Sequence, residues 1–92
     1  MLFAEKIKQL REERQLLQRQ LAAVLEIDTP MYSKIERGDR RAKREQIPII
    51  AEMLQTDPEE LLTLWLADQL TAVVADEKEI AEEALNIVVK RL

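Results

Sequence analysis

Cysteine and histidine, two residue types on which much protein chemistry depends, are absent from this 92-residue sequence. Their absence excludes disulfides, iron–sulfur clusters, zinc sites built from cysteine and histidine, and Ser–His or Cys–His catalytic dyads. The many carboxylates lie in charged helical stretches, without a nucleophile or a glycine-rich phosphate loop near them. We therefore expect no enzymatic activity, no metal and no cofactor.

Long apolar runs are also absent. No stretch approaches the roughly 20 apolar residues of a membrane span. Residues 1–14 mix charged and apolar side chains, whereas a secretory signal peptide needs an uninterrupted apolar segment. We expect a cytoplasmic protein without a membrane partner.

Aromatic residues are scarce, since Phe3, Tyr32 and Trp65 are the only three. Hydrophobic residues nevertheless make up 47% of the chain, carried mainly by leucine, alanine, isoleucine and valine. This composition is typical of helices, and the length suits one compact domain.

Charge is distributed unevenly although the net charge is only −4. Residues 1–46 hold 11 cations against 8 anions, while residues 47–92 hold 3 against 10. Five cations crowd into one segment of eight residues: Arg37, Arg40, Arg41, Lys43 and Arg44. Such a run is often only solvated, but its mutual repulsion favours an anionic partner nearby.

Apolar spacing and helix boundary signals predict an all-α fold of six helices. We place them at about residues 2–14, 18–25, 29–37, 45–54, 58–74 and 76–92. Asp28 and Gly38 are the N-cap and the left-handed stop of the third helix, and Asp76 is the expected start signal of the last. Five helices should form the domain, followed by an additional C-terminal amphipathic helix.

The second and third predicted helices carry the apolar pattern of two short helices crossing through a tight turn. The positions that must be apolar or small are all filled as this crossing requires, by Leu21, Ala22, Leu25, Ile27, Tyr32 and Ile35. A cationic loop follows directly. This arrangement places a helix in the DNA major groove while neighbouring cations contact phosphates.

The segment LREERQLLQRQLAAVLEIDTPMYSKIERGDR, residues 10–40, resembles the lambda-repressor-like helix-turn-helix regulators of the Cro or xenobiotic-response-element type. SKIERG, ending at Gly38, is close to that family's usual recognition-helix ending. The resemblance extends from about Phe3 to Leu66. It implies a five-helix DNA-binding domain over residues 1–66, followed by a C-terminal extension over 67–92. It further implies a prokaryotic or phage regulator, expected to be a repressor, that binds double-stranded operator DNA at the nucleoid.

The resemblance also assigns roles to individual residues. The positions that usually touch base edges are Asp28, Thr29, Pro30, Ser33 and Lys34. The positions at phosphate range are Arg11, Gln18, Arg37, Arg40, Arg41, Lys43 and Arg44. Arg11 and Glu36 fall where family members form an internal ion pair, so a structural role for them is at least as well founded as a DNA contact.

Several residues depart from the family pattern. Gln15, Glu26 and Gln55 replace common glycines, and Leu17 replaces the usual Ser or Thr cap of the second helix. Each replacement costs about 1 kcal/mol in backbone strain or lost capping. Pro30 replaces a side chain that normally bonds a base, which leaves more of the specificity to DNA shape.

The acidic tail allows two interpretations. Its last helix either packs on its own domain or pairs with a second chain, and symmetric half-sites favour a homodimer. The candidate interface residues are Trp65, Leu66, Ile80, Ala84, Leu85, Ile87, Val88 and Leu92. The rival hypothesis is an antitoxin-type interaction module whose acidic C-terminal helices bind a partner protein.

Overall fold

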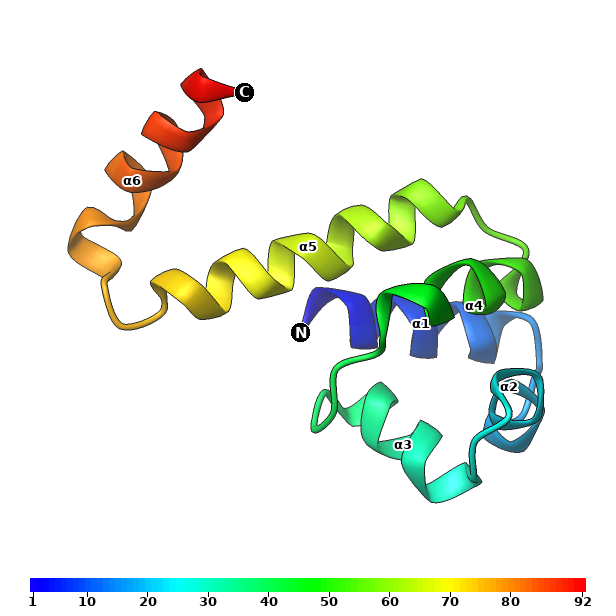
Figure 1. The fold of residues 1–92 in the computed structure, drawn as a ribbon. Coiled ribbons are helices and arrows are strands. Elements are labelled where there is room, and N and C mark those ends of the chain that lie inside the picture. Colours follow the sequence, from blue (N-terminus) through cyan, green and yellow to red (C-terminus); the bar gives the residue numbers. More distant parts are fainter.

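The computed structural model describes all 92 residues and contains six α-helices, one short 3-10 helix and no strand (Figure 1). The elements are α1 (Leu2–Glu13), α2 (Gln18–Leu25), α3 (Thr29–Arg37), η1 (Arg44–Gln46), α4 (Ile47–Leu54), α5 (Pro58–Val74) and α6 (Lys78–Arg91). The expected all-α fold is confirmed. No helix is long and apolar enough to cross a membrane.

The core lies among α1 to α5. Its largest fully buried side chains are Tyr32, Ile7, Leu21, Ile47, Ile50, Leu54 and Leu61. α5 packs against α1 and α4, and α3 packs against both α1 and α2. These contacts fix the two short helices α2 and α3 on a rigid base formed by the longer helices.

Two predicted helix starts need correction. The helix expected from residue 45 is split into η1 and α4, with Pro48 in the first turn of α4. A proline fits there because it has no N–H to donate, whereas deeper in a helix it would clash with the preceding turn. The last helix is preceded by Glu77 rather than Asp76, and no side chain caps it.

Three non-glycine residues adopt the left-handed backbone conformation: Gln15 (φ 56°), Glu26 (φ 57°) and Gln55 (φ 55°). They are the same three positions at which the family resemblance predicts a glycine. Glu26 and Gln55 directly follow the last residues of α2 and α4, and Gln15 lies two residues after the end of α1. At such positions a left-handed residue reverses the chain, so that N–H groups beyond the helix can donate to its last carbonyls. The turns therefore form without glycine, at the cost of strain in each of them.

The C-terminal part extends away from this domain. In Figure 1, α5 continues past the amino terminus of α1, and α6 turns off from its far end. The molecule measures 41 × 23 × 22 Å. No residue of α6 is buried, and only Ala81 and Leu85 are half-buried. We call the second half of α5 together with α6, residues 66–92, the arm.

Candidate nucleic-acid interface

The turn between α2 and α3 is held by main-chain bonds on one side and a side-chain cap on the other. The Glu26 and Ile27 N–H groups donate to the carbonyls of the last turn of α2. The Asp28 carboxylate accepts from the Met31 N–H at 2.7 Å, which makes Asp28 the N-cap of α3. One Asp28 oxygen is thus committed to the helix start.

The inner faces of the two helices are apolar and the outer face of α3 is polar. Leu21, Ala22, Leu25, Tyr32 and Ile35 are buried, and Ile27 is half-buried against them. On α3, the side chains of the opposite face are exposed at Thr29, Pro30, Lys34 and Arg37 and half-buried at Ser33. This face is therefore free to contact a ligand along its whole length.

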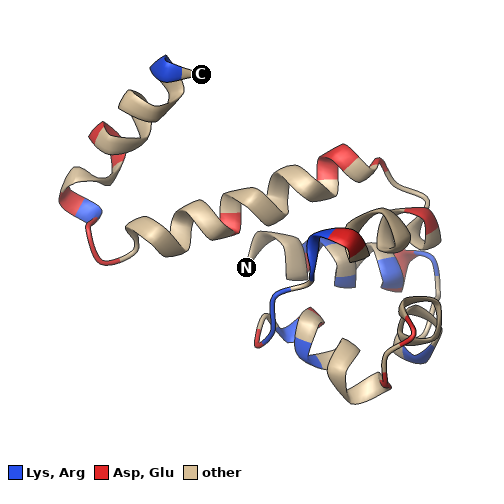
Figure 2. Cartoon of the chain, in the orientation of Figure 1, with Lys and Arg blue, Asp and Glu red and all other residues tan.

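The segment after α3, residues 39–43, is the basic loop. Figure 2 shows its cations next to those at the end of α3. Arg40, Arg41 and Lys43 of the loop, and Arg44 at the start of η1, are exposed, and none of them forms an ion pair within the chain. Arg37 differs, because its Nε lies 3.1 Å from the Asp39 carboxylate. The exposed cations of this segment lie beside the outer face of α3.

Beneath the start of α2 lies a buried polar cluster centred on Glu36. Arg11 donates to both Glu36 oxygens, at 2.7 and 3.1 Å, and also to the Leu16 carbonyl. Gln18 Nε2 donates to Glu36 at 3.2 Å. These bonds join α1, α2 and α3 through one carboxylate whose side chain is 2% exposed. Arg11 and Gln18 are both turned toward Glu36, which leaves only part of their hydrogen-bonding capacity for an external group.

The cluster shifts the pKa values of its members. Burial by itself would raise the pKa of the Glu36 carboxyl, but the hydrogen bond from Arg11, the nearby Tyr32 hydroxyl and the hydrogen bond from Gln18 together outweigh it and hold that pKa below its ordinary value. The hydrogen bond to Glu36 raises the pKa of Arg11. Burial, and then the neighbouring Glu36 charge, raise the pKa of Tyr32, whose hydroxyl makes no hydrogen bond of good geometry. Glu36 is therefore a charged group held in place by its donors.

Sequence reasoning missed two long-range contacts of α5. The Trp65 indole Nε1 donates to the Ala42 carbonyl in the basic loop at 2.8 Å. The Asp68 carboxylate accepts from the Leu2 and Phe3 N–H groups at 2.9 and 3.0 Å, so a residue of α5 caps α1. No local pattern signals such pairs, because their partners lie 23 residues apart for Trp65 and 65 or 66 residues apart for Asp68.

The candidate interface residues of the arm are mostly exposed. Leu66, Ile80, Ala84, Ile87, Val88 and Leu92 are exposed, and Leu85 is half-buried. Trp65 is half-buried against the core of its own domain. Eight of the thirteen large hydrophobic side chains that are exposed in the whole chain belong to the arm, which makes it the main apolar surface of the molecule.

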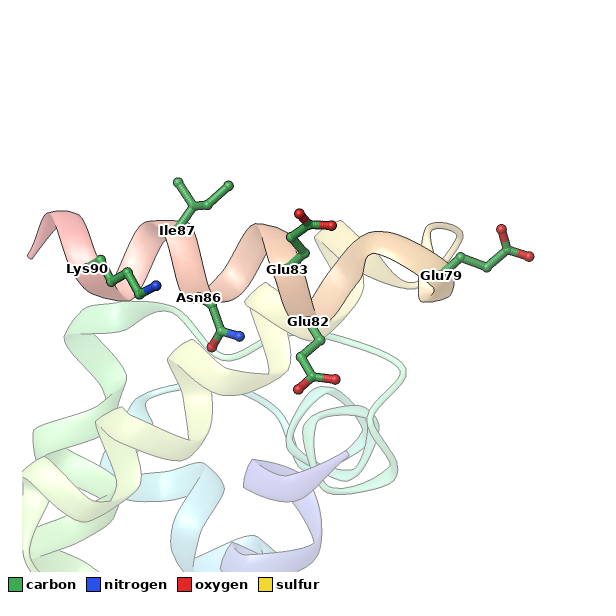
Figure 3. A pocket seen from close by; sticks show the side chains of 6 residues that line it. All are labelled: Glu79, Glu82, Glu83, Asn86, Ile87 and Lys90. Carbon is green, nitrogen blue, oxygen red and sulfur yellow. The ribbon is translucent and has the colours of Figure 1, made fainter.

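The polar side of α6 has a shallow, open depression lined by Glu79, Glu82, Glu83, Asn86, Ile87 and Lys90. In Figure 3 these side chains do not converge: Glu83 and Ile87 point to one side of the helix, Glu82 and Asn86 to the other. The depression therefore has no set of groups aimed at a common ligand.

Comparison with protein families agrees with this geometry. Residues 2–64 match the family model described as a helix-turn-helix domain, and the chain belongs to that family. The match covers α1 to the middle of α5 and stops just before the arm. The protein therefore carries a helix-turn-helix DNA-binding domain of the kind found in regulators. No curated protein and no solved structure matches the chain.

Proposed function

We propose that this protein is a sequence-specific transcriptional repressor of the Cro or xenobiotic-response-element type that places α3 in the major groove of operator DNA. The observation that carries the proposal is the exposed polar face of α3, flanked by unpaired cations of the basic loop. A helix with its outer face free and cations at its end fits a groove lined by phosphates.

Contacts divide between bases and phosphates in this proposal. Lys34, exposed in the second half of α3, donates to guanine O6 and N7, while the Thr29 methyl and the Pro30 ring pack on thymine methyl groups. Asp28 and Ser33 complete the base-reading set. Phosphates are contacted by Arg37 and the basic-loop cations, and by Gln18 at the N-terminus of α2. Arg11 acts mainly through Glu36, since its side chain is only 12% exposed.

The active form in this proposal is a homodimer joined through the arm. Leu66, Leu70 and Val73 follow one another at helical spacing on a side of α5 that does not face the core, and all three are exposed. Along α6, Ile80, Ala84, Ile87 and Val88 form a second apolar stripe. Two-fold pairing of these surfaces removes them from water. In a dimer of the usual helix-turn-helix kind, the two α3 helices bind half-sites about 34 Å apart, one turn of DNA.

The experiment is selection of binding sites from a random duplex pool with the purified protein, followed by titration against the enriched and the random duplex at several salt concentrations. We expect one enriched motif with two-fold symmetry and a salt-dependent affinity. Molecular mass measured in the same buffers should correspond to two chains. A pool that yields no enriched motif at low salt would contradict sequence-specific binding.

A second candidate function rests on the arm. Residues 67–92 hold six carboxylates against three cations, and α6 buries none of its residues. An acidic helix with an uncovered apolar stripe also suits a basic partner protein, as in an antitoxin that represses its own promoter. Mass measurement separates the two functions: a stable dimer with its arm protected from proteolysis favours the repressor, whereas a monomer with a protease-sensitive arm favours the partner-binding module.

A further inference from the structure

Trp65 connects two parts of the molecule that the proposed function treats separately. It lies on α5, in the helix that leads into the arm, and its indole N–H donates to the Ala42 carbonyl at the centre of the basic loop. The ring itself is half-buried against the core. Trp65 is thus a fixed point of the rigid domain to which the loop is bonded.

The loop has few other attachments. Residues 41–43 have no regular secondary structure, and the loop is entered through the left-handed Gly38. At its start, the Asp39 and Arg40 N–H groups both donate to the Lys34 carbonyl. At its end, the Lys43 N–H donates to the Gln46 side chain. Between these points, the Ala42 side chain is buried and the Ala42 carbonyl is held by Trp65.

The attachment of Ala42 affects the neighbouring cations, because buried and exposed side chains alternate along the loop. Ala42 is 2% exposed, while its neighbours Arg41 and Lys43 are exposed. Because Ala42 is drawn inward, the cations on either side of it are turned outward. An alanine methyl group contributes little apolar contact, so the hydrogen bond to its carbonyl is a substantial part of what holds this inward position.

We propose that Trp65 is a positioning residue for phosphate binding, which holds the basic loop through the Ala42 carbonyl so that Arg41 and Lys43 are presented beside α3. The proposal rests on the proposed DNA-binding function. It assigns to α5 a role in DNA recognition although α5 lies outside the interface proposed for α3 and the basic loop. Without the bond the loop samples more conformations, and the phosphate contacts must then offset the entropy lost on ordering it.

The test compares Trp65→Phe, which keeps an aromatic ring but removes the N–H donor, with Thr63→Val. Thr63 donates to the Glu59 carbonyl on an exposed part of the same helix, so its replacement removes a side-chain bond that does not involve the loop. Brief digestion with trypsin, with mass spectrometry of the first products, reports on the loop, because Arg40, Arg41 and Lys43 are cleavage sites. We expect the first cuts in the loop to be about fivefold faster in Trp65→Phe, the factor supplied by one hydrogen bond of ordinary strength. Thr63→Val should match the wild type, and equal loop cleavage in all three proteins overturns the proposal.

The second readout is the salt dependence of binding to random duplex DNA. The slope of log K against log salt should fall by about one to two units in Trp65→Phe, because one or two loop cations no longer contact phosphates. An unchanged slope alongside faster loop cleavage means that the bond is only structural and overturns the proposal. If the wild-type protein binds no DNA at all, the proposed function fails, whereas the cleavage result still reports on the loop.

The wild-type protein allows a third measurement that needs no variant. Its single tryptophan gives one indole N–H resonance in a nitrogen-15 spectrum. We expect that resonance to shift when a duplex binds, since its hydrogen-bond partner lies in the loop that contacts phosphates. An indole resonance that stays in place while the duplex binds overturns the proposal even if Trp65→Phe does not fold.

Discussion

The Arg11 guanidinium lies 2.7 Å from the Glu36 carboxylate, and this pair joins the first helix to the helix that we propose reads DNA. Gln18, the first residue of α2, donates to the same carboxylate. One buried anion thus fixes the relative positions of three helices. The charge through which α3 contacts α1 and α2 is almost fully buried, because the Glu36 side chain is only 2% exposed.

Glu36→Gln should lower the free energy of unfolding at pH 7 by about 2 to 4 kcal/mol, because it leaves Arg11 without its buried partner. The pKa of Glu36 is lower in the folded protein than its ordinary value of 4.5, so its ionised form stabilises the fold above about pH 4.5. That contribution is lost as pH falls through the lower, folded pKa. Urea unfolding at pH 7 and at steps below pH 4.5 measures both effects.

The wild type should therefore lose stability with acid more steeply than Glu36→Gln. Glu52→Gln is a suitable control, since Glu52 is exposed and forms no ion pair in the chain. If the free energy of unfolding falls equally with acid in the wild type and in Glu36→Gln, the pKa of Glu36 is not lowered in the folded protein.

Glu26→Gly should raise the free energy of unfolding by about 0.5 to 1 kcal/mol. Glu26 has a φ of 57°, which glycine adopts without the clash that a Cβ atom causes. Thermal unfolding followed by circular dichroism measures the gain. Gln15→Gly and Gln55→Gly should behave alike, and the three effects should add because they act in separate turns.

Ala23→Gly supplies the contrast for these glycine variants. Ala23 is exposed within α2, three residues before Glu26, where glycine costs about 1 kcal/mol relative to alanine. If glycine lowers the free energy of unfolding at position 23 but raises it at position 26, the effect is due to backbone conformation. A loss of stability at both positions would contradict strain at Glu26.

Lys34→Ala and Arg41→Ala should weaken DNA binding in different ways. The loss of Lys34 should cost about 1 to 3 kcal/mol on the selected site and relax the preference at one base position. The loss of Arg41 should weaken binding to selected and random duplexes alike and reduce the salt slope by about one unit. Equal losses on both duplexes for Lys34→Ala would remove Lys34 from the base-reading set.

Leu70→Lys combined with Val73→Lys should convert the dimer to a monomer. Both side chains are exposed on α5, at 51% and 76%, so the charges cost little in a single chain but are costly in a dry interface. Sedimentation equilibrium measures the mass, and the melting temperature of the five-helix domain at low concentration should change little. Thr71→Lys is the matched control, because Thr71 is exposed on another side of the same helix.

If the double variant sediments with the same dimeric mass as the wild-type protein, the exposed α5 surface is not the dimer interface. A wild-type mass of one chain would instead direct attention to a partner protein for the arm.

The sequence by itself determined most of the local structure. Helix boundaries followed from local signals such as Asp28, Pro58 and Gly38, because capping and backbone preference are short-range effects. The strained positions Gln15, Glu26 and Gln55 were also predicted from the sequence, because the family pattern has glycine at each of them. Where local signals were weak, as at Asp76 and at the start of α4, the predicted boundary moved by one or two residues.

Only the tertiary structure decided which distant groups meet. The bond from Trp65 to the Ala42 carbonyl and the capping of α1 by Asp68 depend on how α5 lies across α1 and the basic loop. Sequence patterns placed Trp65 among the candidate interface residues because it was apolar and near the end of the domain. They could not reveal its hydrogen bond, because such a partner is selected by the packing of whole helices and leaves no periodic trace in the chain.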